Sequence, residues 1–181
     1  MRNHRCVGFV CSGVAVVLAL ACGMTASRVA AQNFGTWRMA TSAELTQVLP
    51  ARAPVLRERI ETEMRTASGV TDGKGKFITG VVLITAGYSA DGKYSHYFLC
   101  QVPMKIGNFT LRPGQYVIGW THMQDGLGVS FYDAMTGRLL GTAEATREKS
   151  SRVDAFRMTP PGENSKIFIG RFSFAYSVEG N

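Results

Sequence analysis

Two histidines and an aspartate carry the clearest chemistry in the sequence. Imidazole and carboxylate groups form acid–base pairs, and three such groups can hold a metal ion. If the strands that carry them are neighbours, His96, His122 and Asp125 converge at one sheet edge as a metal site or an acid–base pair. The chain has no HxH, HExxH or CxxC spacing to enforce this. Strand-end histidines bonded to backbone or water are the simpler interpretation, so we expect no bound metal and no cofactor.

Aromatic side chains are the best material for ligand binding. Tyr116, Trp120 and His122 alternate along one stretch, and with His96 they mark the predicted ligand pocket. Such a concave face can stack sugars or hold apolar ligands. The wider set of candidate aromatics is Tyr88, Tyr94, Tyr97, Trp120, Tyr132 and Tyr176. The alternative is that most of these rings simply belong to the core.

Nucleophilic catalysis finds little support. Ser95 adjoins His96, but neighbours on a strand point to opposite faces, so we expect that these side chains cannot touch. No Gly-x-Ser-x-Gly elbow is present. Cys100 lies in an apolar run, which predicts a buried and inert thiol. The catalytic residues, if any, are unknown, and the sequence favours a protein that is not an enzyme.

The stretch from 111 to 122 must position most of these candidates. Pro113-Gly114 supplies turn chemistry, and the alternating Tyr116, Ile118 and Trp120 that follow predict a strand. A strand with such bulky residues on one face cannot leave that face in water. We therefore expect it in the middle of a sheet that packs on another layer, with Trp120 buried.

Short strands with turn chemistry between them fill the chain from residue 70 to residue 181. Residues 77–86 are apolar at nearly every position, which predicts a strand buried on both faces. The other predicted strands are 94–102, 104–106, 109–111, 111–122, 127–133, 138–146, 153–158, 165–170 and 171–178. This pattern predicts an α+β, β-dominated fold: an antiparallel β-sandwich or partly open barrel of about eight strands, with an N-terminal helix packed on it.

Residues 41–69 are predicted to be helical. Thr41 and Glu44 have the spacing of a capping box, and Pro50 ends the short helix that this box begins. A second helix is predicted from Pro54 to Gly69. Its apolar stripe would consist of Leu56, Ile60, Met64 and Ala67. Residues 41–181 would then form one globular domain.

The first 31 residues have the pattern of a secretory signal peptide. Arg2 and Arg5 precede an uncharged apolar segment, and Ala31 ends a small-residue cleavage site. Residues 32–40 would be a linker. Cys22 ends a lipobox-like run, so a lipid-anchored protein is an alternative, and an uncleaved membrane anchor is a further one. We expect an exported protein, periplasmic or extracellular.

Charge argues against a nucleic-acid partner. The formal charge is +7, but three arginines lie in the leader, so the remaining 17 basic and 13 acidic residues leave +4. The basic residues are scattered, whereas a nucleic-acid arm concentrates them. We expect no nucleic acid, and contact with a membrane only through the leader or a lipid anchor. The partner would be an unknown small ligand or an envelope protein.

Three fragments resemble pieces of the carboxypeptidase-regulatory-like (transthyretin-like) β-sandwich. They are the stretches 71–77, 111–117 and 133–137, the last with the sequence Asp-Ala-Met-Thr-Gly. In that family the Asp-x-x-Thr-Gly element comes first, whereas here it comes last. The chain is also similar to small exported bacterial proteins of unknown function. The resemblance implies a β-sandwich and carries no activity with it.

These observations lead to one hypothesis and two alternatives. The first is a non-enzymatic exported β protein that binds a ligand or an envelope partner. The second is a small secreted enzyme, metal-dependent or acid–base, that uses His96, His122 and Asp125. The third is a purely structural envelope module. Ligand identity and oligomeric state do not follow from the sequence.

Overall fold

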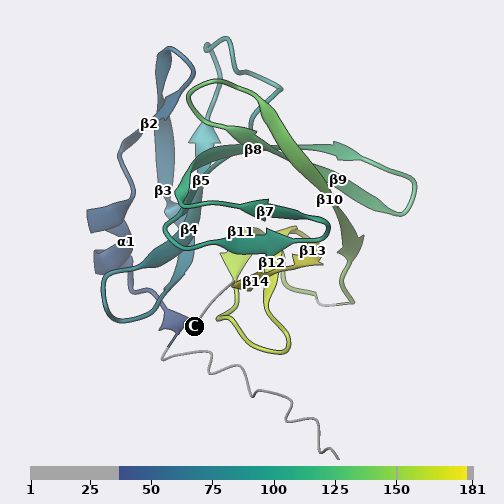
Figure 1. The fold of residues 1–181 in the computed structure, drawn as a ribbon. Coiled ribbons are helices and arrows are strands. Elements are labelled where there is room, and N and C mark those ends of the chain that lie inside the picture. Colours follow the sequence, from purple (N-terminus) through teal and green to yellow (C-terminus); the bar gives the residue numbers. More distant parts are fainter. Residues whose placement is uncertain (1–36, 150, 179–181) are drawn as a thin grey trace, which may run out of the picture. The chain divides into compact units, whose positions relative to one another are not determined.

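Strands make up nearly all of the regular structure. The computed structural model describes residues 37–149 and 151–178, and Figure 1 shows their fold. The elements in chain order are β1 (Arg38–Met39), α1 (Ser42–Val48), β2 (Arg52–Val55), β3 (Glu58–Thr71), β4 (Phe77–Ile84), β5 (His96–Cys100), β6 (Met104–Ile106), β7 (Phe109–Leu111), β8 (Gly114–His122), β9 (Gly126–Asp133), β10 (Leu139–Arg147), β11 (Asp154–Met158), β12 (Lys166–Gly170), β13 (Phe172–Ala175) and β14 (Ser177–Val178).

One large antiparallel sheet organises the domain. Its strand order is β1-β3-β4-β5-β8-β9-β10-β13-β12-β11, and β2 pairs with β3 beside this path. A small second sheet has the order β14-β6-β7. The small sheet follows the ends of β5 and β13 and adds Met104, Ile106 and Leu111 to the inner core. It therefore covers one end of the large sheet's interior.

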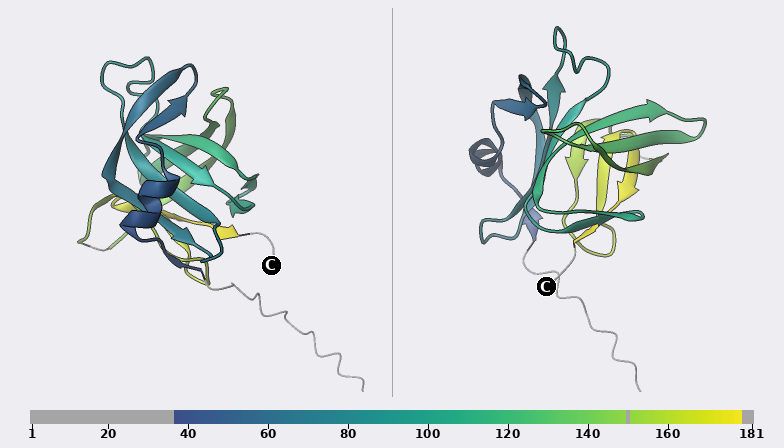
Figure 2. Two further views of the ribbon diagram at one scale, coloured as in Figure 1. Left: turned by 90° about the vertical axis from the view of Figure 1, so that its left-hand side faces the viewer. Right: turned by 45° about the horizontal axis from the view of Figure 1, so that its top comes forward.

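The large sheet curls until its last strand approaches its beginning (Figure 2). β11 packs against β3 and β4, and the Met158 amide donates a hydrogen bond to Ser68 Oγ at 3.2 Å. The Phe156 ring lies against Gly80 of β4. The β-dominated antiparallel class is thus confirmed. The expected eight strands and the sandwich were only approximate, because ten strands form one nearly closed, barrel-like sheet.

Apolar side chains form two cores, one on each face of the sheet. The inner core is enclosed by the curl and contains Phe98, Ile118 and Phe131. The outer core lies between the sheet and the segment from α1 to β2, and contains Tyr97 and Val117. Because β4 contributes to both cores, the prediction of burial on both faces is confirmed for residues 77–83, whereas Ile84 at the end of the strand is exposed.

The first predicted helix is present, and its N-terminus has the expected cap. Thr41 Oγ1 accepts from the Glu44 amide, and Glu44 accepts from the Thr41 amide at 2.8 Å. α1 buries Leu45 and lies outside the curled sheet beside β3 (Figure 2). None of the helices formed by residues 37–149 and 151–178 is long and apolar enough to cross a membrane.

The second predicted helix, residues 54–69, is wrong. These residues form the hairpin of β2 and the 14-residue β3. From Arg59 onward the charged residues of β3 recur at every second position, which is the period of a strand face. They are Arg59, Glu61, Glu63 and Arg65, and Glu58 at the start of the strand lies outside this pattern. Pairing with β4 favours a strand over a helix here. Without β3, the amide and carbonyl groups along that side of β4 would be unpaired.

β8 holds the central position predicted for residues 111–122. It pairs with β5 on one side and β9 on the other, and Ile118 is fully buried. The expectation that Trp120 is buried is wrong, since its residue exposure is 39%. The strand runs past the inner core, so Trp120 and His122 lie at the open end of the sheet's interior.

Candidate functional site

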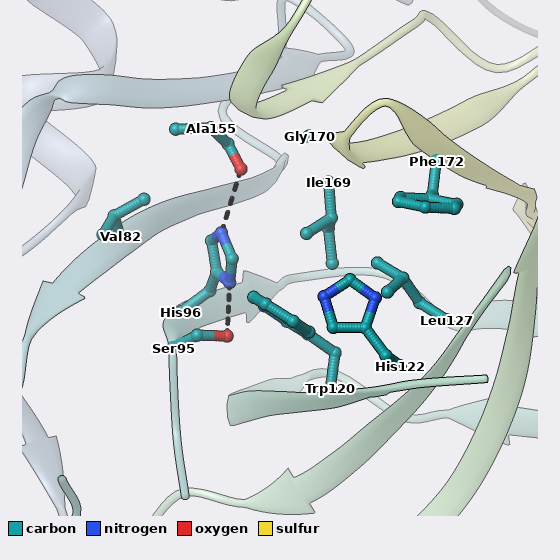
Figure 3. Close-up of a pocket in the computed structure, with 10 residues that line it drawn as sticks. All are labelled: Val82, Ser95, His96, Trp120, His122, Leu127, Ala155, Ile169, Gly170 and Phe172. Carbon is teal, nitrogen blue, oxygen red and sulfur yellow. Dashed lines mark hydrogen bonds between the residues drawn. The ribbon is translucent and has the colours of Figure 1, made fainter. Parts of the chain in front are cut away.

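An apolar cavity of about 330 Å³ lies at that open end, opposite the small sheet. The open end is formed by the last residues of β4, β8 and β12 and by the first residues of β5, β9, β11 and β13. Ten residues line the cavity, and Figure 3 shows them. They are Val82, Ser95, His96, Trp120, His122, Leu127, Ala155, Ile169, Gly170 and Phe172. None of them carries a carboxylate, ammonium or guanidinium group.

His96 forms the polar part of the cavity's inner wall. It is the first residue of β5 and projects to the same face as Phe98, so its ring enters the inner core, where only 3% of the residue is exposed. Its Nε2 lies 3.1 Å from the carbonyl oxygen of Ala155 on β11. A carbonyl can only accept, so Nε2 carries the hydrogen and His96 ties β5 to β11 across the closure of the sheet.

Burial keeps this imidazole uncharged. Desolvation lowers the pKa of His96 to about 4, and the hydrogen bond to Ala155 opposes only part of that shift. Phe156 packs beside the ring at 5.5 Å between centroids. An imidazole with so low a pKa is a weak general base at neutral pH, so its geometry fits a structural and ligand-facing role better than proton abstraction.

Ser95 contacts His96, which corrects the sequence-based expectation. Ser95 Oγ lies 2.8 Å from His96 Nδ1 and 3.1 Å from the Ile118 carbonyl oxygen. Ser95 precedes β5 by one residue, so strand alternation does not fix its side chain. Because Nε2 holds the ring hydrogen, Nδ1 of the neutral ring accepts from the Ser95 hydroxyl. Ser95 as a residue is half-buried and lines both this cavity and the neighbouring one.

Trp120 and His122 form the outer wall. Both project from β8 into the cavity, Trp120 toward His96 and His122 toward Ile169 (Figure 3). The two rings meet edge to face with centroids 5.3 Å apart, and His122 also meets Phe172 at 6.4 Å. Edge-to-face contact is the favoured arrangement for such rings. Three of the four predicted ligand-binding residues therefore line one cavity. They are His96, Trp120 and His122.

Tyr116, the fourth ligand-binding candidate, lies elsewhere. It is buried in the inner core, and its hydroxyl donates to the Arg112 carbonyl near the other end of β8. Burial raises the pKa of Tyr116 to about 12. The predicted pocket residue is thus a core residue, because alternation specifies a face of the strand but not a position along it.

Asp125 is also separate from the histidines. It lies in the turn between β8 and β9 and lines a different cavity with Glu144. Within the described part of the chain, no group of three or more His, Cys, Asp or Glu side chains could hold a metal ion. The structure therefore brings His96 and His122 to one cavity and leaves Asp125 out of it.

The second half of the cavity wall was missed from the sequence. Ala155, Ile169 and Phe172 belong to β11, β12 and β13, which reach the histidines only because the sheet closes. The alternation of Ile167 and Ile169 marked an inward face but not its partner. No local signal could indicate that partner.

The structure tests the prediction made for Cys100 but not the one made for Cys22. Cys100 is a buried free thiol, as predicted, and burial raises its pKa to about 12. Its Sγ lies 2.9 Å from the carbonyl oxygen of Val102. Cys22, the predicted leader 1–31 and most of the predicted linker 32–40 lie outside the described residues.

Two of the three fragments that resemble the transthyretin-like sandwich lie at hairpins, and the third connects the two sheets. Residues 71–77 connect β3 to β4, residues 111–117 lead from β7 into β8, and residues 133–137 connect β9 to β10. In the last turn, Asp133 Oδ1 accepts from the Met135 and Thr136 amides. Comparison of the chain with protein-family models, curated proteins and solved structures gives no match.

Proposed function

We propose that this chain is an exported, non-enzymatic binding protein that holds a small apolar ligand at the open end of its barrel-like sheet. The observation that carries the proposal is the cavity of about 330 Å³ between Trp120 and Phe172. Cavities of about 300 Å³ and above, lined by apolar and aromatic side chains with a few polar groups, are typical of small-ligand sites. The leader-like sequence of residues 1–31 supports export.

Burial of the cavity wall gives the ligand a fixed surface to bind. Ile169 and Leu127 are almost completely buried, and His96 is held by two hydrogen-bonded neighbours. A wall that needs little rearrangement loses little conformational entropy when a ligand binds. The exposed face of Trp120 then provides apolar area that a ligand can cover.

Fluorescence titration with the uncharged dye N-phenylnaphthylamine tests the proposal. The dye emits strongly only in apolar surroundings, so we expect saturable enhancement with one site per chain. Val82→Trp places bulk in the cavity and should abolish the enhancement. Leu139→Trp adds the same group at an exposed position, opposite Tyr132 at the end of β9 that is far from the cavity. This variant should bind the dye like the wild type. Equal binding by both variants, or no binding by the wild type, contradicts the proposal.

The alternatives predict different results. A structural envelope module would bind no dye at all. The metal-dependent enzyme predicts stoichiometric zinc in the purified full chain, lost in His122→Ala. The acid–base enzyme has one supporting contact, between Ser95 and His96, while Asp125 lines a separate cavity.

A further inference from the structure

We infer that the ligand of this cavity carries an anionic head, such as the carboxylate of a fatty or aromatic acid, and that Arg147 and His122 receive it at the rim. The inference rests on the proposed function and names the ligand's chemical class. An apolar tail would occupy the space between Trp120 and Phe172. The head would stay at the wet edge of the cavity, where an ion need not lose all its water.

Strand register places Arg147 at the rim. Arg147 is directly opposite Phe172 in the pairing of β10 with β13. Opposite residues in an antiparallel pair project to the same face, and Phe172 lines the cavity. Ala143 and Ala145, which precede Arg147 at alternate positions, belong to the inner core. The guanidinium therefore follows the inner-facing row of β10 to its exposed end.

Both candidate donors lack a competing anion. Arg147 takes part in none of the ion pairs formed among residues 37–149 and 151–178. His122 makes ring contacts with Trp120 and Phe172, and no described residue hydrogen-bonds its nitrogens. An imidazole and a guanidinium without partners at an apolar cavity can both donate to a carboxylate.

The nearest acidic residues are already occupied or face elsewhere. The Glu148 carboxylate binds Lys166 Nζ at 2.6 Å and also accepts from Ser173, so the pKa of Glu148 is lowered. Asp154, opposite Gly170, binds Arg152 and Arg157 at 2.8 Å. Asp125 lines the separate cavity beyond Leu127. The rim thus presents positive rather than negative charge to a ligand.

Displacement of bound N-phenylnaphthylamine by octanoate and by octanol tests the inference, since the two share a tail and differ in the charge of the head. For the wild type we expect octanoate to displace the dye at a concentration about fivefold lower than octanol, as an exposed ion pair would give. Arg147→Met keeps an apolar stem and should make the two equally effective. Arg138→Met, the same change in the turn between β9 and β10, should keep the octanoate preference.

The possible results distinguish a failure of the anionic-head inference from a failure of the proposed function. If the dye binds but octanoate and octanol displace it equally from the wild type, the anionic head is wrong and the apolar site stands. An octanoate preference that survives Arg147→Met overturns the role of Arg147. If neither the dye nor either competitor binds, the site and its ligand class fall together.

Discussion

His96 joins two strands that no backbone hydrogen bond connects. Its ring bridges Ser95 and Ala155, and both bonds lie at the wall of the cavity (Figure 3). Because Nδ1 accepts and Nε2 donates, the contact needs the neutral ring, and protonation would place an uncompensated charge beside Phe156. The wall of the ligand cavity and the closure of the sheet at His96 therefore both depend on the ring remaining neutral.

Stability should therefore fall in mild acid. The pKa of His96 is about 4 in the folded chain and 6.5 in the reference state, so the unfolded chain binds the proton first. The stabilisation is complete above pH 6.5 and is lost as the pH falls toward 4. Between about pH 7 and about pH 4.5 the loss amounts to about 2–3 kcal/mol of unfolding free energy.

Denaturant unfolding of the wild type and of His96→Gln at both pH values measures this loss. The wild type should lose about 2–3 kcal/mol more than His96→Gln, which has no titrating ring at this position. His122→Gln serves as the control and should follow the wild type. Parallel losses in wild type and His96→Gln would contradict the assignment.

Cys100 should be unreactive in the folded protein. Burial removes access and raises the pKa of the thiol to about 12, so almost no thiolate exists at neutral pH. Alkylation followed by mass spectrometry of the peptide that contains Cys100 should show labelling only after unfolding. Labelling of that peptide in native protein, at the rate of a small free thiol, would contradict its burial.

The sequence predicts the face of a strand on which a side chain lies better than its position along the strand. Alternation along β8 correctly put Trp120 and His122 on the inward face, together with Ile118. It could not say that Tyr116 lies deep in the core while Trp120 lies at the open end. It also failed for Ser95, because a residue just outside a strand does not follow the strand's alternation.

Elements were predictable where turn chemistry marked their ends. The strands β6, β7 and β9 to β12 begin and end within two residues of the predicted bounds, whereas β8 begins at Gly114, three residues later than predicted. Glycine or proline marks several of the turns between them, and a polar loop separates β10 from β11. β3 was missed because its apolar residues happened to fit a helical stripe. Its charged residues from Arg59 to Arg65 have a period of two, which indicates a strand face.

The contact between β4 and β11 provides a test at this scale. A Cβ on Gly80 would lie 2.5 Å from the Phe156 ring, so Gly80→Ala must displace the ring that joins β11 to β4. We expect a loss of about 1–3 kcal/mol in unfolding free energy, the usual cost of overpacking. Thermal or denaturant unfolding measures it.

Gly162→Ala is the matched control. Nothing lies within 4 Å of a Cβ added at Gly162, so its unfolding free energy should stay within about 0.5 kcal/mol of the wild type. If Gly80→Ala were as stable as Gly162→Ala, Phe156 would not pack on β4 as described.

At the scale of the whole domain, the closure of the sheet creates the cavity. β11 ends the strand order of the large sheet, and it meets β3 and β4 only through the curl of the sheet, which Figure 1 shows with β12 and β13 beside it. Strand lengths and turns predict an antiparallel sheet, but sandwich and barrel share those features. The architecture was therefore predicted only as a class, and half of the cavity wall was missed with it.

The indole signals of the two tryptophans test the central claim most directly. Trp120 borders the cavity, whereas Trp37 precedes β1, which pairs with the far end of β3. In a nitrogen-15 correlation spectrum of the labelled protein, Trp120→Phe assigns the two indole peaks. On addition of N-phenylnaphthylamine, the account predicts that the Trp120 peak shifts to saturation while the Trp37 peak stays in place. A stationary Trp120 peak while the dye is bound, or a shift of Trp37 alone, would contradict a ligand site at the open end of the sheet.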